Sequence, residues 1–375
     1  MIKIGIVTSG LSKTDGWGRY SSEIIQNLKN YGQVKVVTHA AEAIEGIELY
    51  PILPPPLSNY LNLARCSYKI ARHLKDCDVI HCFAEPYAPL IAFINKFLRK
   101  PFIMTVFGTY AIRPLNHPIK GRLLRFAYQN ADRVLCISKF TENEILKRVL
   151  LSNLQVIPGG VNYKKFQINT TEANMSKKAI LSVGAIKPRK GQDVSIKAFA
   201  KVRETIPNVE YYIVGSIHNK AFYNELQDLA RKLDVEEAIN FVDEIAEDEK
   251  LISMYYSCDV FALTSRYVDD NFEGFGFVYL EANACGKPAI GTYGCGAEDA
   301  IIDGYNGILV PQNNPEKTAE AIEYLLNNPE IAKKMGENGR RRAEQLSWEN
   351  LTKRITVVYE SILKNKGQRF ENGGE

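Results

Sequence analysis

The sequence predicts an α/β protein built from two tandem Rossmann-like domains, each with a doubly wound parallel sheet. Three observations support this fold class. Continuous apolar runs rich in β-branched residues alternate with segments of helical period, as in parallel sheets covered by helices on both faces. The pattern starts again after the polar stretch 162–178, which has neither period, and the domain boundary is placed near residue 166. The length of 375 residues fits two domains of about 100 to 200 residues each.

In the first half, each apolar run ends at turn-forming residues before a helical segment begins. Helices are expected to open at Arg19 and to cover 58–75 and much of 113–133. The strands are expected at 2–8, 34–38, 79–83, 102–107, 134–138 and 156–161.

The second half repeats this order, with helices expected at 193–204 and 221–233. A last helix, 348–364, carries apolar side chains at helical spacing and must pack on something; we expect its part 355–375 to return to the first domain. The domains are therefore placed at 1–165 and 166–354. The strands are expected at 179–183, 209–214, 239–242, 260–264, 288–292 and 307–310.

Composition excludes several classes of protein. With 45% apolar and 24% charged residues, the chain is neither disordered nor fibrous. The net charge of +4 hides an asymmetry, because residues 1–165 hold 22 Lys and Arg against 11 Asp and Glu, while the remainder holds 25 against 32. A basic half fits an anionic membrane surface or an acidic substrate. Nucleic acid is not expected, because no recognised binding motif accompanies the charge.

The cysteines and the apolar segments indicate a cytoplasmic protein. Seven cysteines form no C-x-x-C pair and lie mostly in apolar runs, which fits a reducing compartment. The first residues do not resemble a secretion signal, and no apolar run reaches 18 residues. Any membrane contact is expected to be peripheral.

A glycine loop follows the first strand. The sequence has no P-loop, and Gly16 and Gly18 lack the third glycine of a dinucleotide fingerprint. A loop that ends at these glycines and opens a helix would present backbone N–H groups to an anion. A purely structural turn explains the same residues.

The second half contains two more specific stretches. Lys187, Arg189 and Lys190 follow a strand and precede a helix, a placement that suits a diphosphate. Further on, Glu273 and Glu281 lie eight residues apart in a glycine-rich segment, and both would share one helix face if that helix began early. The glycines at 274 and 276 would let the backbone approach a ligand, and a third glycine loop follows at 294–299.

At these stretches the chain resembles the retaining GT-B glycosyltransferases of family 4, the sucrose-synthase-like and mannosyltransferase-like group. The resemblance covers most of the length and is carried by four segments: the strand-turn 184–191, the run C-D-V-F-A-L-T-S-R at 258–266, E-x7-E at Glu273 and Glu281, and G-x-G-x-E-D at 294–299. It implies two Rossmann-like domains facing across a cleft, with the nucleotide-sugar on the second and the acceptor on the first.

Carried over by position, the resemblance implies the following roles. Glu273 would act in catalysis by contacting the donor sugar, and Glu281 would bind the ribose. The donor diphosphate would be bound by Lys190, Arg189 and the backbone at Phe275, Gly276, Gly16 and Gly18. No metal and no cofactor would be needed, because cations and helix N-termini can stabilise a diphosphate leaving group. D-x-D at Asp76 and Asp78 is better explained as a helix-to-strand turn.

Two positions depart from the family pattern. Phe107 stands where many members have a histidine, and Ala185 where many have an arginine. Lys187 or Arg189 would replace the missing charge, and Phe107, Tyr110 and Gly274 would line the sugar or acceptor pocket. His117 is a candidate substitute for the missing histidine, although a surface position explains it better.

The hypothesis is a retaining, metal-independent glycosyltransferase that moves a hexose or N-acetylhexosamine in polysaccharide or glycoconjugate biosynthesis. The donor would be a UDP-sugar, with GDP-mannose as second candidate, and the acceptor a glycan or lipid-linked glycan. Basic residues at 65, 69 and 72 and at 120, 122 and 125 would face lipid headgroups at the inner face of the cytoplasmic membrane, or act only as solvated surface. Two alternatives stay open: a GT-B nucleotide-sugar epimerase and a nucleotide-sugar-binding subunit without turnover.

Overall fold

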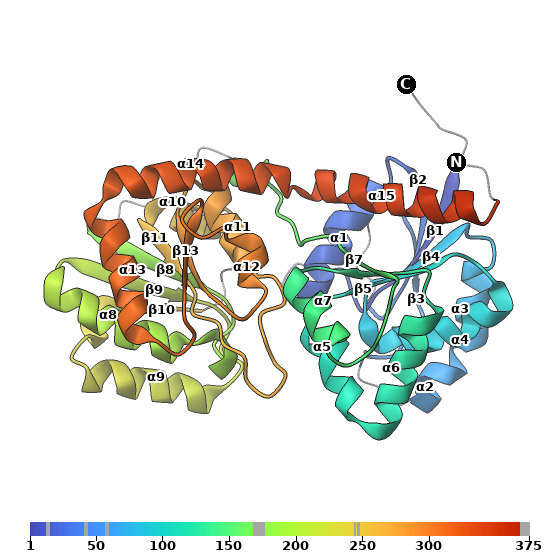
Figure 1. The fold of residues 1–375 in the computed structure, drawn as a ribbon, viewed down its shortest axis with the longest axis horizontal. Coiled ribbons are helices and arrows are strands. Elements are labelled where there is room, and N and C mark those ends of the chain that lie inside the picture. The colour runs from blue at the N-terminus through green and yellow to red at the C-terminus, as the bar shows by residue number, and fades with distance from the viewer. Residues whose placement is uncertain are drawn as a thin grey trace. The chain divides into compact units, whose positions relative to one another are not determined.

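A computed structural model describes residues 1–12, 16–40, 44–56, 60–167, 177–243, 245 and 248–367. The chain forms two compact units (Figure 1). The first consists of Met1–Gly159 together with Trp348–Glu375, and the second of Gly160–Ser347. Each unit contains one parallel sheet, so the predicted fold class is confirmed.

The first unit has a seven-stranded sheet in the order β3-β2-β1-β4-β5-β6-β7. All neighbouring strands are parallel, and the central strands are buried. The reversal of strand order beside β1 makes the sheet doubly wound. Its strands are β1 (Ile2–Val7), β2 (Gly32–Thr38), β3 (Glu48–Pro51), β4 (Val79–Cys82), β5 (Phe102–Val106), β6 (Arg133–Cys136) and β7 (Leu154–Val156).

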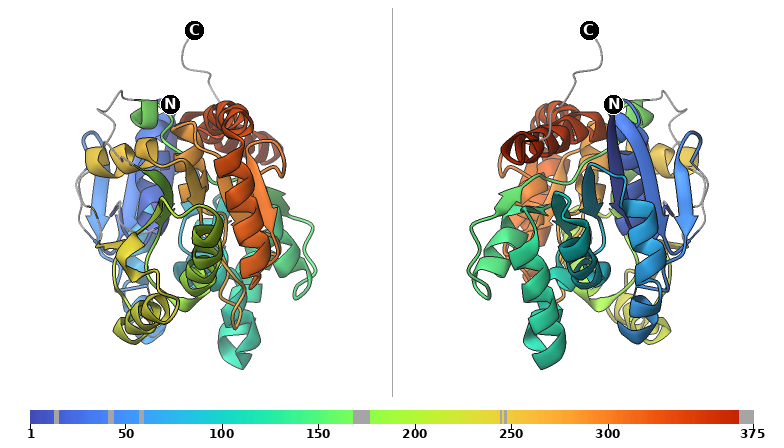
Figure 2. Two further views of the ribbon diagram at one scale, coloured as in Figure 1. Left: turned by 90° about the vertical axis from the view of Figure 1, so that its left-hand side faces the viewer. Right: turned by 90° about the vertical axis from the view of Figure 1, so that its right-hand side faces the viewer.

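Helices cover both faces of this sheet (Figures 1 and 2). On one face α3, α4 and α6 pack in a row, and on the other α1 packs against α15. The helices are α1 (Gly16–Leu28), α2 (Tyr60–Arg65), α3 (Ser67–Leu74), α4 (Ala88–Leu98), α5 (Thr109–Ile112), α6 (Pro118–Asn130), α7 (Lys139–Leu146) and α15 (Trp348–Asn365), with 3-10 turns η1 (Glu85–Tyr87) and η2 (Arg113–Asn116).

The C-terminal helix α15 belongs to the first unit, as expected from its amphipathic pattern. Trp348 and Tyr20 of α1 pack edge to face, with ring centroids 5.7 Å apart. The hydroxyl of Tyr359 lies 2.7 Å from Nδ1 of the buried His81 on β4. The other ring nitrogen of His81 lies 2.9 Å from the Thr105 hydroxyl, so the buried imidazole has a partner on both sides. Residues 368–375 of the predicted segment lie outside the described residues.

The second unit has a six-stranded parallel sheet in the order β10-β9-β8-β11-β12-β13. One core cluster joins α8, α9 and α13 to the sheet. Its strands are β8 (Lys178–Val183), β9 (Val209–Val214), β10 (Ile239–Val242), β11 (Val260–Ala262), β12 (Ala289–Thr292) and β13 (Gly307–Val310). Its helices are α8 (Gln192–Thr205), α9 (Lys220–Lys232), α10 (Asp248–Ser257), α11 (Phe277–Ala284), α12 (Ala297–Ala300), α13 (Pro315–Asn327) and α14 (Pro329–Gln345), with 3-10 turns η3 (Lys165–Gln167), η4 (Pro188–Lys190) and η5 (Glu236–Ala238).

The chain passes from one unit to the other at residues that differ from the predicted domain boundaries. The backbone N–H of Val161 donates to the carbonyl of Leu346 at 3.0 Å, and Val161 forms a parallel bridge with Ser347. Both crossing segments therefore pair within the second unit, which begins at Gly160 and ends at Ser347 instead of covering 166–354. Part of the predicted polar linker, 168–176, lies outside the described residues.

Several elements differ from the sequence prediction. The predicted helix 58–75 is two helices, α2 and α3, separated at Cys66, and its positions 58 and 59 lie outside the described residues. Strand β3 was not predicted, and β7 ends at Val156, where a run extending to 161 was expected. Helix α1 includes Gly16, three residues before the predicted opening at Arg19.

The seven cysteines are free thiols, and six of them are buried. No helix in the described ranges combines the length and the apolar character needed to cross a bilayer.

Candidate functional site

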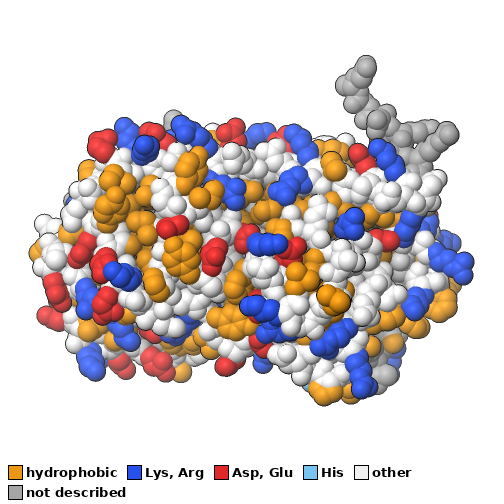
Figure 3. All heavy atoms as spheres, in the orientation of Figure 1, with side chains coloured by type: hydrophobic (Ala, Val, Ile, Leu, Met, Phe, Trp, Pro, Cys, Tyr) orange, Lys and Arg blue, Asp and Glu red, His pale blue; other side chains and the backbone are white. Residues whose placement is uncertain are grey.

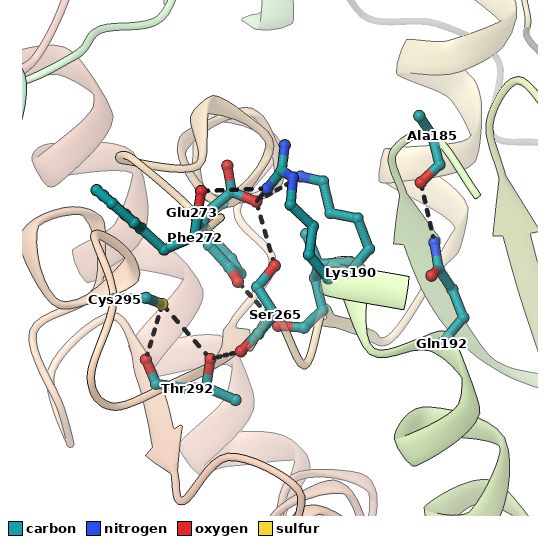
Figure 4. Close-up of polar contacts among 11 residues, drawn as sticks. Ala185, Lys190, Gln192, Ser265, Phe272, Glu273, Thr292 and Cys295 are labelled. Carbon is teal, nitrogen blue, oxygen red and sulfur yellow. Dashed lines mark hydrogen bonds and ion pairs between the residues drawn. The ribbon is translucent and has the colours of Figure 1, made fainter. Parts of the chain in front are cut away.

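The candidate site lies in the second unit, at the carboxyl ends of β8, β11 and β12. Turn η4 follows β8 and carries Arg189 and Lys190, while Ser265 follows β11 and Glu273 lies in the loop before α11. Carboxyl ends of parallel strands meet at one edge of a sheet, which is where doubly wound sheets bind ligands. Figure 4 shows the side chains of Lys190 and Ser265 directed toward Glu273.

The carboxylate of Glu273 is the centre of this cluster. Its Oε2 lies 2.5 Å from Lys190 Nζ and 3.3 Å from an Arg189 guanidinium nitrogen, and it accepts a hydrogen bond from the Ser265 hydroxyl at 3.1 Å. Glu273 is only 8% exposed. Burial alone would raise its pKa, but Lys190 and Arg189 lower the pKa of Glu273 to about 2. The carboxylate is therefore ionised at neutral pH.

The cluster holds more cations than anions. Lys187, Arg189 and Lys190 come from one turn, and Glu273 is the carboxylate that pairs with two of them. Burial, together with the positive charge of Arg189 and Lys190, lowers the pKa of Lys187 to about 8. An edge of the sheet with an excess of cations and few counter-charges can bind an anionic group such as a diphosphate.

The backbone next to Glu273 is shaped by glycines. Gly276 has φ of +84° and ends the loop directly before α11. At Gly296, a Cβ atom would lie 2.0 Å from the carbonyl oxygen of Gly274, so the two loops can meet only because this residue has no side chain. The N–H of Gly296 donates to the Glu273 carbonyl at 2.7 Å and fixes this contact.

The helix does not begin early enough to carry both carboxylates. Because α11 starts at Phe277, Glu273 lies in the preceding loop and does not share a helix face with Glu281. Glu281 is 4% exposed and accepts a hydrogen bond from the Tyr255 hydroxyl of α10 at 2.8 Å. The suggested common face is wrong, since the left-handed conformation of Gly276 delays the start of the helix.

The backbone donors expected at Phe275 and Gly276 lie at this helix start. The Gly276 carbonyl accepts a hydrogen bond from the Tyr279 N–H at 3.1 Å. Among the described backbone hydrogen bonds, none has the N–H of Phe275 or Gly276 as its donor. The side chain of Phe275 is buried. Both N–H groups therefore remain candidates for a ligand oxygen.

Ala185, which stands where many family members have an arginine, takes part in a contact with the next helix. Gln192, the first residue of α8, donates its side-chain amide to the Ala185 carbonyl at 3.2 Å (Figure 4). Arg266 bridges neighbouring loops: its Nε donates to the Pro188 carbonyl at 2.9 Å, and its guanidinium pairs with Asp193 at 3.1 Å. These contacts hold the cationic turn in place.

The remaining site residues from the sequence lie in the first unit. Gly16 and Gly18 are in the first turn of α1, and a Cβ at Gly18 would lie 2.0 Å from the Ser12 carbonyl oxygen, so a close packing contact already requires that glycine. Phe107 follows β5 and packs edge-on against Tyr20 with centroids 4.9 Å apart. Tyr110 is 39% exposed.

Two weaker candidates have structural surroundings. His117 is the N-cap of α6, and its Nδ1 accepts from the backbone N–H of Ile119 at 3.2 Å. In the D-x-D, Asp76 pairs with Lys35 at 2.8 Å, and Asp78 accepts from the backbone N–H of Lys3 at 2.8 Å. Within the described part of the chain, no group of three or more His, Cys, Asp or Glu side chains is suited to a metal ion.

Two residues of interest were not singled out from sequence. Ser265 belongs to the quoted T-S-R run, but only the fold brings its hydroxyl to Glu273. Glu85 is a lone carboxylate in the apolar segment 82–91, and it is buried directly after β4. The sequence signal that could have identified Glu85 is an acidic residue within an apolar run.

Both halves of the chain match family models. Residues 164–342 match the model of "Glycosyl transferases group 1", and residues 14–165 match "Glycosyltransferase Family 4".

Two curated proteins illustrate the sequence similarity. An uncharacterized glycosyltransferase of Methanocaldococcus jannaschii is 32% identical over 301 residues, which cover 79% of this chain and 80% of that protein. A GDP-mannose-dependent alpha-(1-6)-phosphatidylinositol monomannoside mannosyltransferase of Mycolicibacterium smegmatis is 30% identical over 234 residues, 60% of each chain.

Two solved structures share the fold over nearly the whole length. An Anabaena protein in complex with UDP and glucose superposes with a TM-score of 0.80 at 19% identity, covering 96% of this chain and 100% of that one. A glycosyltransferase from Rickettsia africae superposes with a TM-score of 0.83 at 22% identity, covering 97% and 99%.

Proposed function

Because the chain belongs to the glycosyl transferases group 1, the family 4 glycosyltransferases of GT-B fold, we propose that it transfers a hexose or N-acetylhexosamine with retention of configuration. The donor is a nucleotide-diphosphate sugar, a UDP-sugar first and GDP-mannose second. The acceptor is a glycan or a lipid-linked glycan. The Anabaena structure was solved in complex with UDP, and the relative from Mycolicibacterium smegmatis is described as GDP-mannose-dependent. Donors with uracil and guanine are therefore the first to test.

One observation carries this proposal: Arg189 and Lys190 pair with the ionised carboxylate of Glu273 at the carboxyl end of β8, and Lys187 adds a third cation beside them in the same chain segment. When the bond between the anomeric carbon and the diphosphate breaks, its electron pair moves to the diphosphate, and Lys190 and Arg189 stabilise that charge. The N–H groups of Phe275 and Gly276 add donors to the phosphate oxygens. Transfer proceeds without a metal ion.

The carboxylates have separate roles in this proposal. Glu273 lies beside the phosphate-binding cations and contacts the hydroxyl groups of the donor sugar, with Gly274 next to it. Glu281 binds the ribose, for which its hydrogen bond with Tyr255 has to yield or be shared.

The test is a panel of UDP-, GDP- and ADP-sugars incubated with purified protein in EDTA. Consumption of one donor, faster with a glycan acceptor, is the expected result and identifies the donor. Binding of a donor with no consumption would instead identify a nucleotide-sugar-binding subunit, and conversion of the donor into a second free nucleotide-sugar would identify an epimerase. Consumption that needs added Mn²⁺ would contradict the metal-independent mechanism.

Donor binding is expected to weaken at alkaline pH because of Lys187. Its ammonium is charged below its pKa of about 8 and becomes neutral as the pH rises through this value, so one phosphate-binding charge is lost. A bound diphosphate raises that pKa, which places the loss above pH 8 in the complex. We expect the donor Kd to rise by about tenfold between pH 7 and pH 10, the loss of one charge-assisted hydrogen bond.

Lys187→Arg is the matched control, since the guanidinium stays charged over this range. Calorimetric titration of the nucleoside diphosphate should give a nearly flat pH profile for this variant. Parallel profiles in the variant and the wild type would remove Lys187 from the donor site.

The acceptor side of the protein is proposed to contact an anionic membrane. The cations of the two predicted basic stretches lie on α2, α3 and α6, and α4 packs between α3 and α6. Helix α4 exposes Phe93 by 54% and Phe97 by 76%, with centroids 5.6 Å apart. Figure 3 shows several lysine and arginine side chains over the lower right of the molecule, where Figure 1 places α5 and α6. Apolar side chains among cations fit an anionic bilayer surface.

Vesicle sedimentation tests this contact. Binding to vesicles with phosphatidylglycerol, and not to phosphatidylcholine alone, is expected, with a loss of at least about threefold in Phe93→Ser/Phe97→Ser. Val357→Ser is the control, because Val357 is a 61% exposed apolar residue on α15. Equal binding by both variants would contradict the proposed surface.

A further inference from the structure

A buried carboxylate in the first unit has no part in the donor site. Glu85 opens η1 directly after β4 and is 2% exposed. One oxygen accepts from the backbone N–H of Phe107 at 2.7 Å, and the other accepts from the indole N–H of Trp17 at 3.0 Å. No lysine or arginine of the described residues forms an ion pair with Glu85, so these two donors stabilise the anion.

A glutamate at position 85 can accept both hydrogen bonds, and a glutamine cannot. A carboxylate can accept a hydrogen bond at each oxygen, whereas the amide of a glutamine would direct its own N–H groups at one of the two donors. Glu85 therefore holds two segments that are far apart in sequence: the first turn of α1, which carries Trp17, and the loop after β5, which carries Phe107.

The segments held by Glu85 form an aromatic pair. The ring of Trp17 packs on Tyr110 with centroids 4.6 Å apart and an interplanar angle of 37°. Trp17 is half-buried and Tyr110 is 39% exposed, so part of the pair faces outward. Phe107, the other partner of Glu85, packs edge to face with Tyr20. The indole cannot turn away from Tyr110 without breaking its hydrogen bond to Glu85.

The place of this pair in the sheet indicates a ligand. Trp17, Glu85 and Phe107 follow β1, β4 and β5, which are neighbours in the sheet and parallel. Their carboxyl ends form the edge where doubly wound sheets bind ligands, and the strand order reverses at this point. A partly exposed aromatic pair beside a few fixed polar groups is typical of a small-molecule site. The C–H face of a pyranose ring stacks on such aromatic surfaces.

We propose that Trp17 and Tyr110 form a stacking platform for a pyranose ring of the acceptor, and that Glu85 is the positioning residue that holds this platform. The inference rests on the proposed function, because it assigns the platform to the sugar that receives the transferred unit. It adds Trp17 and Glu85 to the site and names a neutral pyranose as the chemical class that they recognise.

Tryptophan fluorescence tests the platform directly. The chain has two tryptophans, Trp17 and Trp348, so Trp348→Phe leaves Trp17 as the single reporter. We expect a saturable change of its emission with at least one of three probes: methyl α-D-glucopyranoside, methyl α-D-mannopyranoside and methyl N-acetyl-α-D-glucosaminide. Glycerol should cause none, and Tyr110→Ala in the same background should weaken the response about tenfold. If Trp348→Phe does not fold, the difference between wild type and Trp17→Phe gives the same signal.

Glu85→Gln tests the positioning role with a pH profile. Burial raises the pKa of Glu85 to about 7, against the lowering effect of the N–H groups of Phe107 and Trp17 and of its own backbone N–H. The titratable groups that face it are Cys82, Tyr128 and Cys136, all buried with raised pKa values and therefore uncharged near neutral pH. Protonation of Glu85 below pH 7 removes one acceptor, so Trp17 emission and probe affinity should change with a midpoint near 7.

In Glu85→Gln this transition should be absent, and probe affinity should be about tenfold weaker at pH 8. If Glu85 had a purely structural role, Glu85→Gln would retain the pH-dependent change of Trp17 emission, or this change would shift in pH together with the unfolding transition. No response of Trp17 emission to any of the three glycosides, or an equal response in Tyr110→Ala, would overturn the platform.

The donor panel separates this inference from the proposed function. Trp17→Ala, Tyr110→Ala and Glu85→Gln are expected to lose at least about tenfold in transfer to the acceptor. If wild type consumes a donor but transfer is unchanged in these variants, the platform is wrong and the proposed function stands. If wild type consumes no donor, the proposed function fails, and the fluorescence titration still decides whether the pair binds a pyranose.

Discussion

Glu273→Ala is expected to lower the rate of sugar transfer by about 100-fold or more, the size of effect seen when one fixed electrostatic group is removed from an active site. Glu273 is the single carboxylate that pairs with Arg189 and Lys190 among the described residues. Its loss leaves no anion to orient the hydroxyl groups of the donor sugar. The positive charge facing the diphosphate increases, so donor binding should be retained or tightened while kcat falls.

Initial rates at varied donor concentration measure the two effects separately. Glu273→Gln keeps the shape of the side chain and should also lose most of the activity, because a neutral amide cannot form ion pairs with Arg189 and Lys190. Glu320→Ala is the matched control, since Glu320 is an exposed carboxylate on α13 that pairs with Lys317. A wild-type kcat in both Glu273 variants would remove this residue from the mechanism.

Lys190→Ala is expected to have the second large effect, on stability as well as on donor binding. Its ammonium lies 2.5 Å from Glu273, and both side chains are 10% exposed. Removing one partner of a buried ion pair leaves the other charge with less compensation and costs about 3–5 kcal/mol of unfolding free energy. The donor diphosphate also loses a buried cation, which should lower kcat/KM by about 1,000-fold.

A double-mutant cycle distinguishes a coupled pair from two independent residues. Lys190→Ala/Glu273→Ala should be destabilised by less than the sum of the single variants, because no unpaired charge remains. Urea unfolding measures the free energies, and Lys201→Ala provides the control, as Lys201 pairs with Glu316 at the surface of α8. Additive free energies would mean that the 2.5 Å contact contributes no coupling.

Most strands could be predicted from sequence because buried parallel strands have a strong local pattern. Runs such as 102–107 and 260–264 are continuously apolar or β-branched and are bounded by turn residues. Strand β3 has the sequence E-L-Y-P, too short and too polar for that pattern, and it lies at the edge of its sheet. The break at Cys66 was missed because the apolar spacing continues across it, from Leu63 to Ile70.

The site was only partly predictable for a related reason. The residues of the cationic turn and the E-x7-E segment are near one another in sequence, so their pattern was visible. The contact between Lys190 and Glu273 joins residues 83 positions apart and depends on how β8 and β11 pair. Likewise, nothing local to Glu85 indicates that its partners are Trp17 and Phe107, because three strands have to align before they meet. A helix start at Phe277 depends on the conformation of a single glycine, Gly276.

The position of α15 has a consequence for the synthesis of the protein. Trp348 and Tyr359 complete the packing around Tyr20 and His81, which are translated well before them. The unit whose chain emerges first from the ribosome is therefore the last to obtain its full set of contacts, whereas Gly160–Ser347 is already continuous. A fragment that stops at Gly159 leaves an apolar face of α1 exposed, and the nascent chain carries this uncovered surface until α15 has been made.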